Sequence, residues 1–166
     1  EKITEISAAE HLAALRSEQK DLVELSFSPI CGYGEHGAIV HYSATEESDV
    51  ELKPESFFLV DAGGHYLDGT TDTTRTFAMG PLTDEQKKMY TAVLRGNLNL
   101  AHARFLKGCS GYNLDVICRT PLWQIGMDYK HGTGHGVGYL LNVHEGPNTF
   151  RWKLPEGANA AELEPG

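Results

Sequence analysis

DAGGHYLDGTTDTTRTF, the segment from Asp61 to Phe77, has the pattern of a β-hairpin. Residues 56–61 form an apolar run typical of a buried strand, and the threonine-rich residues 70–77 favour a second strand. Glycine and aspartate between the two runs predict a turn. Asp61 and Asp72 therefore fall in strand-type segments, where aspartate is rare by backbone preference and needs another explanation.

These two aspartates have two interpretations. Two carboxylates in one place are typical of a binding site for a hard or borderline cation. Alternatively, each aspartate caps a turn, since Asp61 precedes Gly63 and Asp72 follows Gly69. Both interpretations stay open from these residues alone.

The register of the hairpin decides whether the two carboxylates can meet. A turn centred on Tyr66-Leu67 places positions 61 and 72 opposite each other on the same face. Asp68-Gly69 is the stronger turn signal, and it shifts the aspartates roughly four residues apart, about 13 Å, which is too far to share an ion. A bulge or a wider loop would then have to restore the register.

A second motif, HGTGHGVG at residues 131–138, carries two histidines among four glycines, so a helix is not expected there. In an extended segment His131 and His135 share a face but lie about 13 Å apart. At most one of them can then bind a given metal centre, while the other faces substrate. The alternatives are a flexible loop with incidental histidines, or a phosphate-binding loop, which the missing GK[ST] ending and the acidic charge oppose.

Two further histidines follow short apolar runs, His41 after Ile39-Val40 and His144 after residues 140–143. A single histidine in such a place is more often structural than catalytic. Several histidines and aspartates at strand ends together indicate a functional site.

Helix and strand patterns around these motifs indicate an α+β domain with helices packed on a mostly antiparallel sheet. Capping boxes at Ser7/Glu10 and Thr83/Gln86 predict where two helices begin. Pro121 should kink a third helix or mark its end. We expect helices over 7–20, 83–106 and 114–125, a strand over 38–41 and a loop over 32–34.

Composition excludes several classes of protein. The 166 residues fit one domain, and a formal charge of −9 argues against nucleic acid or an anionic membrane surface as a partner. The chain contains no apolar run of about 18 residues, which argues against a membrane span. Three widely spaced cysteines, Cys31, Cys109 and Cys118, fit buried thiols in a reducing compartment, and therefore a cytoplasmic protein.

Four segments together resemble one family, the pita-bread-fold metallopeptidases, and within it the Xaa-Pro aminopeptidases. The resemblance covers essentially the whole chain, and it implies the pita-bread fold. We expect residues 1–166 to be part of a catalytic domain, without the family's N-terminal domains and the C-terminal part of the catalytic domain. The matching segments are Glu1–Glu10, Gly37–Tyr42, Asp61–Phe77 and His131–Pro147.

The resemblance also implies roles for individual residues. Asp61, Asp72 and His135 match the family's metal ligands, with Asp72 bridging two divalent ions, most often Mn²⁺. His41, His131 and His144 match its catalytic histidines, which bind substrate and handle protons. Two glutamate ligands lie further downstream in the family, and Glu164 does not match either of them.

Peptides with proline in second position are the implied substrates, and the full-length protein is expected to be a homodimer. A chain that ends before the glutamate ligands should be inactive by itself. An alternative is a binding module of the same fold that has lost its metals, although such relatives lose the aspartates or the histidine. A prolidase or a methionine aminopeptidase would share the site, but HGTGHGVG and DGTTDTTRT favour an aminopeptidase P.

Overall fold

The computed structural model describes residues 2–165 and divides the chain into two compact units. The first unit comprises Glu1–Leu82 with Val137–Val143, and the second comprises Thr83–Gly136 with His144–Gly166. No helix among residues 2–165 is both long enough and apolar enough to cross a membrane.

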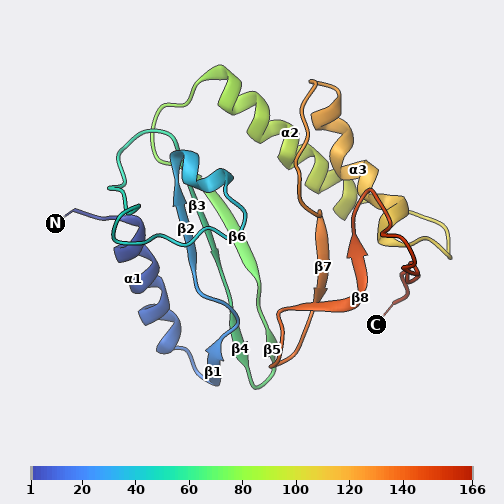
Figure 1. The fold of residues 1–166 in the computed structure, drawn as a ribbon, viewed down its shortest axis with the longest axis horizontal. Helices are drawn as coiled ribbons and strands as arrows, with labels where there is room; N and C mark the ends of the chain where they lie inside the picture. The colour runs from blue at the N-terminus through green and yellow to red at the C-terminus, as the bar shows by residue number, and fades with distance from the viewer. Residues whose placement is uncertain (1, 166) are drawn as a thin grey trace. The chain divides into compact units, whose positions relative to one another are not determined.

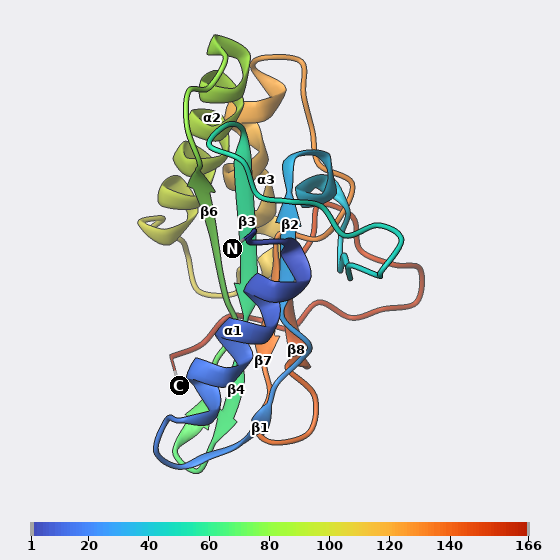
Figure 2. The same cartoon turned by 90° about the vertical axis from the view of Figure 1, so that its left-hand side faces the viewer.

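The first unit consists of one α-helix, a short 3₁₀ helix and two three-stranded sheets (Figure 1). One sheet has the strand order β2-β3-β6 and the other β1-β4-β5, with antiparallel pairing throughout. Helix α1 packs against β2 (Figure 2). The elements are α1 Glu5–Ser17, β1 Leu22–Leu25, β2 Ile30–Tyr33, η1 Gly34–Ala38, β3 Phe57–Ala62, β4 Gly64–Tyr66, β5 Gly69–Thr70 and β6 Thr73–Ala78.

Strand β3 is the centre of the first sheet and confirms the strand predicted for residues 56–61. Phe58 and Ala62 on β3 are buried together with Cys31 on β2, so alternate apolar residues of the central strand supply the core. The strand predicted for residues 70–77 is present in two pieces, β5 and β6, with Asp72 between them.

Three predictions near the N-terminus are wrong. The loop predicted for 32–34 is absent, since Gly32 and Tyr33 end β2 and Gly34 begins η1. Gly32 is needed because the chain passes close to itself there: a Cβ would lie 2.9 Å from Gly37 Cα. The strand predicted for 38–41 is instead the end of η1 followed by a turn. Helix α1 covers 5–17 rather than the predicted 7–20, and its capping box joins Thr4 to Ser7 rather than Ser7 to Glu10.

The second unit contains two long helices and a two-stranded sheet (Figure 1). Thr83 and Gln86 form the predicted capping box of α2. Helix α3 begins three residues before its predicted start and ends two residues after Pro121. The elements are α2 Asp84–Ala101, α3 Gly111–Trp123, β7 Gly134–Val137 and β8 His144–Phe150.

Gly96 allows α2 and α3 to approach each other closely. A Cβ at position 96 would lie 2.1 Å from the carbonyl oxygen of Cys118, so no other residue fits there without movement of a helix. Ala92, Leu114 and Leu122 are buried in this unit.

Candidate metal centre

Asp61 lies near the end of the central strand β3 and is half-buried. Its neighbours across the sheet are Ile30 on β2 and Thr74 on β6. The strand is fixed by pairing on both sides, so the carboxylate is carried by a rigid element.

Asp72 lies just before β6, where the hairpin ladder opens. Ala62 pairs with Thr73, which makes Gly63 the residue opposite Asp72. Gly63 is required there, because a Cβ would lie 1.9 Å from the Thr71 carbonyl oxygen. Antiparallel alternation therefore puts Asp72 on the same face as Asp61, one diagonal step away.

Thr71 holds this opening in place through bonds to two neighbouring segments. Its backbone N–H donates to Gly64 O at 2.9 Å, and its carbonyl oxygen accepts from the Ser26 hydroxyl at 2.9 Å. The Gly64 backbone N–H donates to the Thr71 hydroxyl at 3.0 Å. Asp72 follows directly on this anchored residue.

The turn of the hairpin differs from both predicted positions. Tyr66 pairs with Gly69, so Leu67 and Asp68 form the connection. The register therefore lies midway between the two alternatives, and the aspartates are offset by roughly two residues rather than zero or four. No bulge is needed between them.

His135 lies on β7, as expected for an extended segment, whereas His131 precedes this strand. In both residues Nδ1 faces the carbonyl oxygen of the following glycine, at 2.7 Å for His131 and 2.8 Å for His135. A carbonyl only accepts, so Nδ1 carries the proton and the lone pair is on Nε2. This is the tautomer that a metal-binding histidine requires when Nε2 is the ligand atom.

His144 is the first residue of β8, and its ring lies against that of His135. The two ring centroids are 3.9 Å apart and the rings are inclined at 53°. Both side chains are exposed. The pairing of β7 with β8 thus brings together two histidines that the sequence placed in separate segments.

His41 lies in a turn and has a left-handed backbone conformation, with φ of 57°. The turn is held by two backbone bonds, from Ile39 N–H to His36 O at 3.1 Å and from Tyr42 N–H to Ile39 O at 3.2 Å. His41 itself is exposed, while the next residue, Tyr42, is buried. The buried Tyr42 side chain therefore fixes the position of the His41 backbone at the surface.

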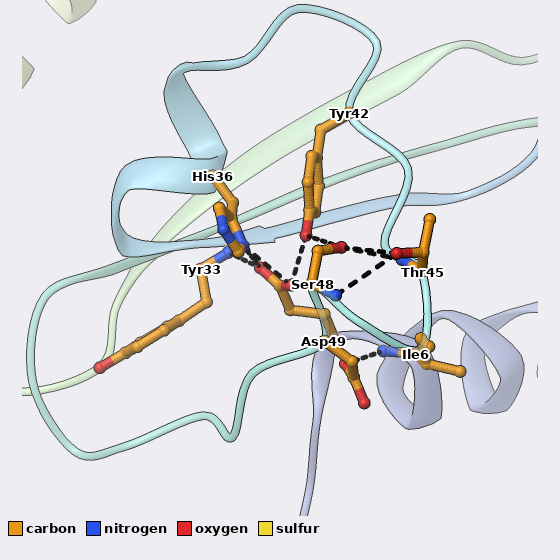
Figure 3. A network of polar contacts seen from close by, with 8 residues as sticks. Ile6, Tyr33, His36, Tyr42, Thr45, Ser48 and Asp49 are labelled. Atoms are coloured by element: carbon orange, nitrogen blue, oxygen red, sulfur yellow. Dashed lines mark hydrogen bonds and ion pairs between the residues drawn. The ribbon is translucent and has the colours of Figure 1, made fainter.

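The fully buried carboxylate of Glu5 holds Tyr42 in place by a hydrogen bond. The Tyr42 hydroxyl donates to Glu5 Oε2 at 2.9 Å, and the Tyr33 backbone N–H donates to Oε1 at 2.6 Å. His36 Nδ1 lies 3.0 Å from both oxygens, and its ring stacks on Tyr42 at 4.6 Å between centroids. Figure 3 shows Tyr42 and His36 reaching this carboxylate, while Ser48 contacts the Tyr42 hydroxyl, at 3.2 Å.

Sequence reasoning missed Glu5 and also a buried ion pair between Asp115 and Arg119 on α3. Glu5 gave no signal, because its role depends on residues 28 to 37 positions away. The ion pair is detectable in the sequence, because Asp115 and Arg119 lie four residues apart in a helix, next to the apolar residues Leu114 and Leu122.

The donor set suits borderline divalent ions. The hairpin provides two carboxylates on one face, and His135 provides a nitrogen whose tautomer is fixed by the Gly136 carbonyl. Carboxylate oxygen favours Mn²⁺ and Mg²⁺, whereas imidazole favours Zn²⁺ and Fe²⁺, and a mixed set accommodates ions between these limits. Each of these side chains is therefore of a type that can serve as a metal ligand.

Comparison with known proteins places the chain in a family. The model of metallopeptidase family M24 matches residues 1–166. The chain belongs to metallopeptidase family M24. Aminopeptidase P1 of Arabidopsis thaliana is 47% identical to this M24 chain over 152 residues, which cover 92% of the chain and 24% of the plant protein. A probable Xaa-Pro aminopeptidase P of Colletotrichum graminicola is 49% identical over 171 residues, covering 99% of the chain and 28% of that protein.

Solved structures agree with the expected fold. The X-prolyl aminopeptidase of Caenorhabditis elegans, described as a cytosolic enzyme with a di-nuclear active site, matches 99% of the M24 chain with a TM-score of 0.90 and 42% identity. The prolidase of Pyrococcus furiosus matches 99% with a TM-score of 0.82 and 26% identity. The α+β pita-bread fold is thereby confirmed. The chain spans about a quarter of the length of the curated relatives and 26% of the nematode enzyme.

Proposed function

We propose that this M24 chain carries most of the catalytic site of a Xaa-Pro aminopeptidase, which removes the first residue of peptides with proline in second position. The observation that carries the proposal is the placement of Asp61 and Asp72 on one face of a hairpin in a chain whose histidine segment is set up for metal binding. The high identity to aminopeptidases P supports the same substrate class.

In this proposal Asp61, Asp72 and His135 would hold two divalent ions, most often Mn²⁺. The bound ions supply an activated water and polarise the scissile carbonyl. The aspartates come from the hairpin of the first unit and His135 comes from β7. Two further ligands in the family are glutamates, and no residue of this chain is assigned to either of them.

Three further histidines, His41, His131 and His144, bind the substrate and move protons in this proposal. His144 lies against His135, so its imidazole is carried beside a metal ligand and can donate a hydrogen bond to a developing oxyanion. His131 keeps its lone pair on Nε2, which can accept a proton. His41, fixed by Tyr42, contacts the peptide around its proline.

We also propose a cytoplasmic location and a homodimeric full-length protein. The nematode relative is described as a cytosolic enzyme. Cys31, Cys109 and Cys118 are free thiols, which suits a reducing compartment.

The test uses the chain within its full-length protein. With Mn²⁺ added, release of arginine from Arg-Pro-Pro, with no release from Arg-Ala-Ala, is the expected result. Turnover of the dipeptide Arg-Pro alone would instead identify a prolidase. The absence of turnover with Mn²⁺, Zn²⁺, Co²⁺ or Mg²⁺ would overturn the proposal and favour a binding module.

A further inference from the structure

We propose that the buried Asp115–Arg119 pair of α3 acts as a positioning device for His135, by holding the segment 128–133 that leads into β7. The inference rests on the proposed function, since it assigns His135 a metal. Every contact that carries it lies within the second unit.

Arg119 makes four hydrogen bonds from a side chain with no exposed surface. Its Nε donates to Asp115 Oδ2 at 2.6 Å. Nη1 donates to Asp128 Oδ1 at 3.0 Å and to Tyr129 O at 2.7 Å, and Nη2 donates to His131 O at 2.8 Å. Three of the four hydrogen bonds of the guanidinium therefore go to residues 128–131, which lie outside α3.

Asp115 holds the same stretch from its other carboxylate oxygen. The Thr133 hydroxyl donates to Asp115 Oδ1 at 2.5 Å and also contacts the Tyr129 hydroxyl. On the opposite side, the Thr133 backbone N–H donates to Phe150 O at 2.8 Å, which ties the segment to β8. Thr133 is therefore held on two sides, only two residues before His135.

The Tyr129 ring closes this arrangement. The centre of the Arg119 guanidinium lies 3.9 Å from the ring centroid, and the ring lies 4.9 Å from that of His131. Burial alone would lower the pKa of Arg119, but its hydrogen bonds to Asp115 and Asp128 outweigh that effect and raise the pKa. The guanidinium therefore stays charged and keeps every donor proton.

A structural role alone does not account for this pair. Burying an ion pair contributes little net stability compared with apolar residues of the same size. The glycines on either side of Thr133 give the segment no rigidity of its own, so its path depends on outside bonds. Metal ligands must be held within about 0.5 Å of their productive position, and loss of an outer partner typically weakens metal binding about 10- to 100-fold.

The experiment compares two variants with matched controls in the full-length protein. Arg119→Lys keeps the charge but loses the planar fork, and Thr133→Val removes only the hydroxyl. The controls are Arg95→Lys on the exposed face of α2 and Thr120→Val, whose hydroxyl bonds only within α3 at Val116 O. Three quantities are measured: Mn²⁺ dissociation constants by calorimetry, the visible spectrum of the Co²⁺ form, and the ¹⁵N shifts of His135 in the metal-free protein.

We expect both test variants to bind at least one ion about 10- to 100-fold more weakly, with altered Co²⁺ bands and shifted His135 resonances, while both controls match the wild type. If Arg119→Lys does not fold, Thr133→Val carries the test. A lower melting temperature with wild-type ion affinity, spectrum and shifts would reduce the pair to a structural role and overturn the inference. In that case the wild-type protein is still expected to show peptidase activity, so the proposed function stands. A wild-type protein that binds no pair of ions would overturn both the proposed function and this inference.

Discussion

Thr74, and not Asp72, lies directly opposite Asp61 in the ladder between β3 and β6. Asp72 is the diagonal neighbour of Asp61, at a Cα separation of about 7–8 Å for this geometry. That distance leaves room for ions between two carboxylates, whereas a directly opposed pair would place like charges in contact. The threonine fills the facing position without adding a third charge.

The first prediction separates these two neighbours of Asp61. Asp72→Asn should weaken Mn²⁺ binding by at least about 100-fold, because a lost ligand costs more than a lost outer partner. Thr74→Val should leave binding within a factor of about 3, since the hydroxyl has no ligand role. Calorimetric titration of both variants in the full-length protein is the measurement. Equal losses in the two variants would mean that the diagonal register does not set the ligands.

The second prediction concerns the backbone at His41. Asparagine tolerates the left-handed conformation, so His41→Asn should keep the wild-type melting temperature while kcat/KM falls by about 100-fold or more through loss of the imidazole. His41→Val should in addition destabilise the fold by about 1–2 kcal/mol, because a β-branched residue is strained at φ of 57°. Thermal unfolding and peptide hydrolysis separate the two effects. Unchanged kcat/KM in His41→Asn would remove His41 from the substrate site.

The third prediction concerns the close approach of α2 to α3. Helix propensity alone predicts that Gly96→Ala gains about 1 kcal/mol. The new Cβ would instead meet the Cys118 carbonyl oxygen at 2.1 Å, so we expect a loss of about 1–3 kcal/mol. Asn97→Ala, one residue along on the exposed face, is the control and should be neutral or slightly stabilising. A stabilised Gly96→Ala variant in denaturant unfolding would contradict the packing.

The fourth prediction is a pH dependence. Partial burial opposes ionisation of Asp128, but the hydrogen bond from Arg119, together with one from the Tyr129 backbone, outweighs this and lowers the pKa of the carboxyl. A lowered pKa contributes stability that is present above the unfolded value of about 3.9 and is lost as pH falls through the folded value.

The difference in free energy of unfolding between wild type and Asp128→Asn should therefore be constant above about pH 5 and shrink below about pH 4. Urea unfolding from pH 3 to pH 7 measures it. A difference that does not change with pH would show that the Asp128 charge has no part in holding this segment.

Local patterns in the sequence predicted much of the fold. Strand β3 follows from its apolar run, and the start of α2 follows from Thr83 and Gln86, because each signal lies within a few residues of the feature it sets. The loop predicted for residues 32–34 is wrong, because Gly32 is needed for the close approach of Gly37 in η1, which no local pattern specifies. Sequence-based prediction therefore fails where a residue and the partners that determine its structure are far apart along the chain.

The candidate site shows the same limit. The sequence shows the residue types of Asp61, Asp72 and His135 but not the register of the hairpin, because the strongest turn signal, Asp68-Gly69, lies one residue beyond the observed connection Leu67-Asp68. The contact between the His135 and His144 rings depends on the pairing of β7 with β8, which no local pattern specifies.

The ion pair between Asp115 and Arg119 also ties the two positions together in evolution. Replacing either residue alone would leave a charge without its counterion inside the protein, at a cost of about 3–5 kcal/mol. A lineage can abandon the pair only through a double substitution or by passing through an unstable intermediate. We therefore expect both residues to be inherited as a unit wherever peptidase function is selected, and to be lost together in descendants that no longer need a metal.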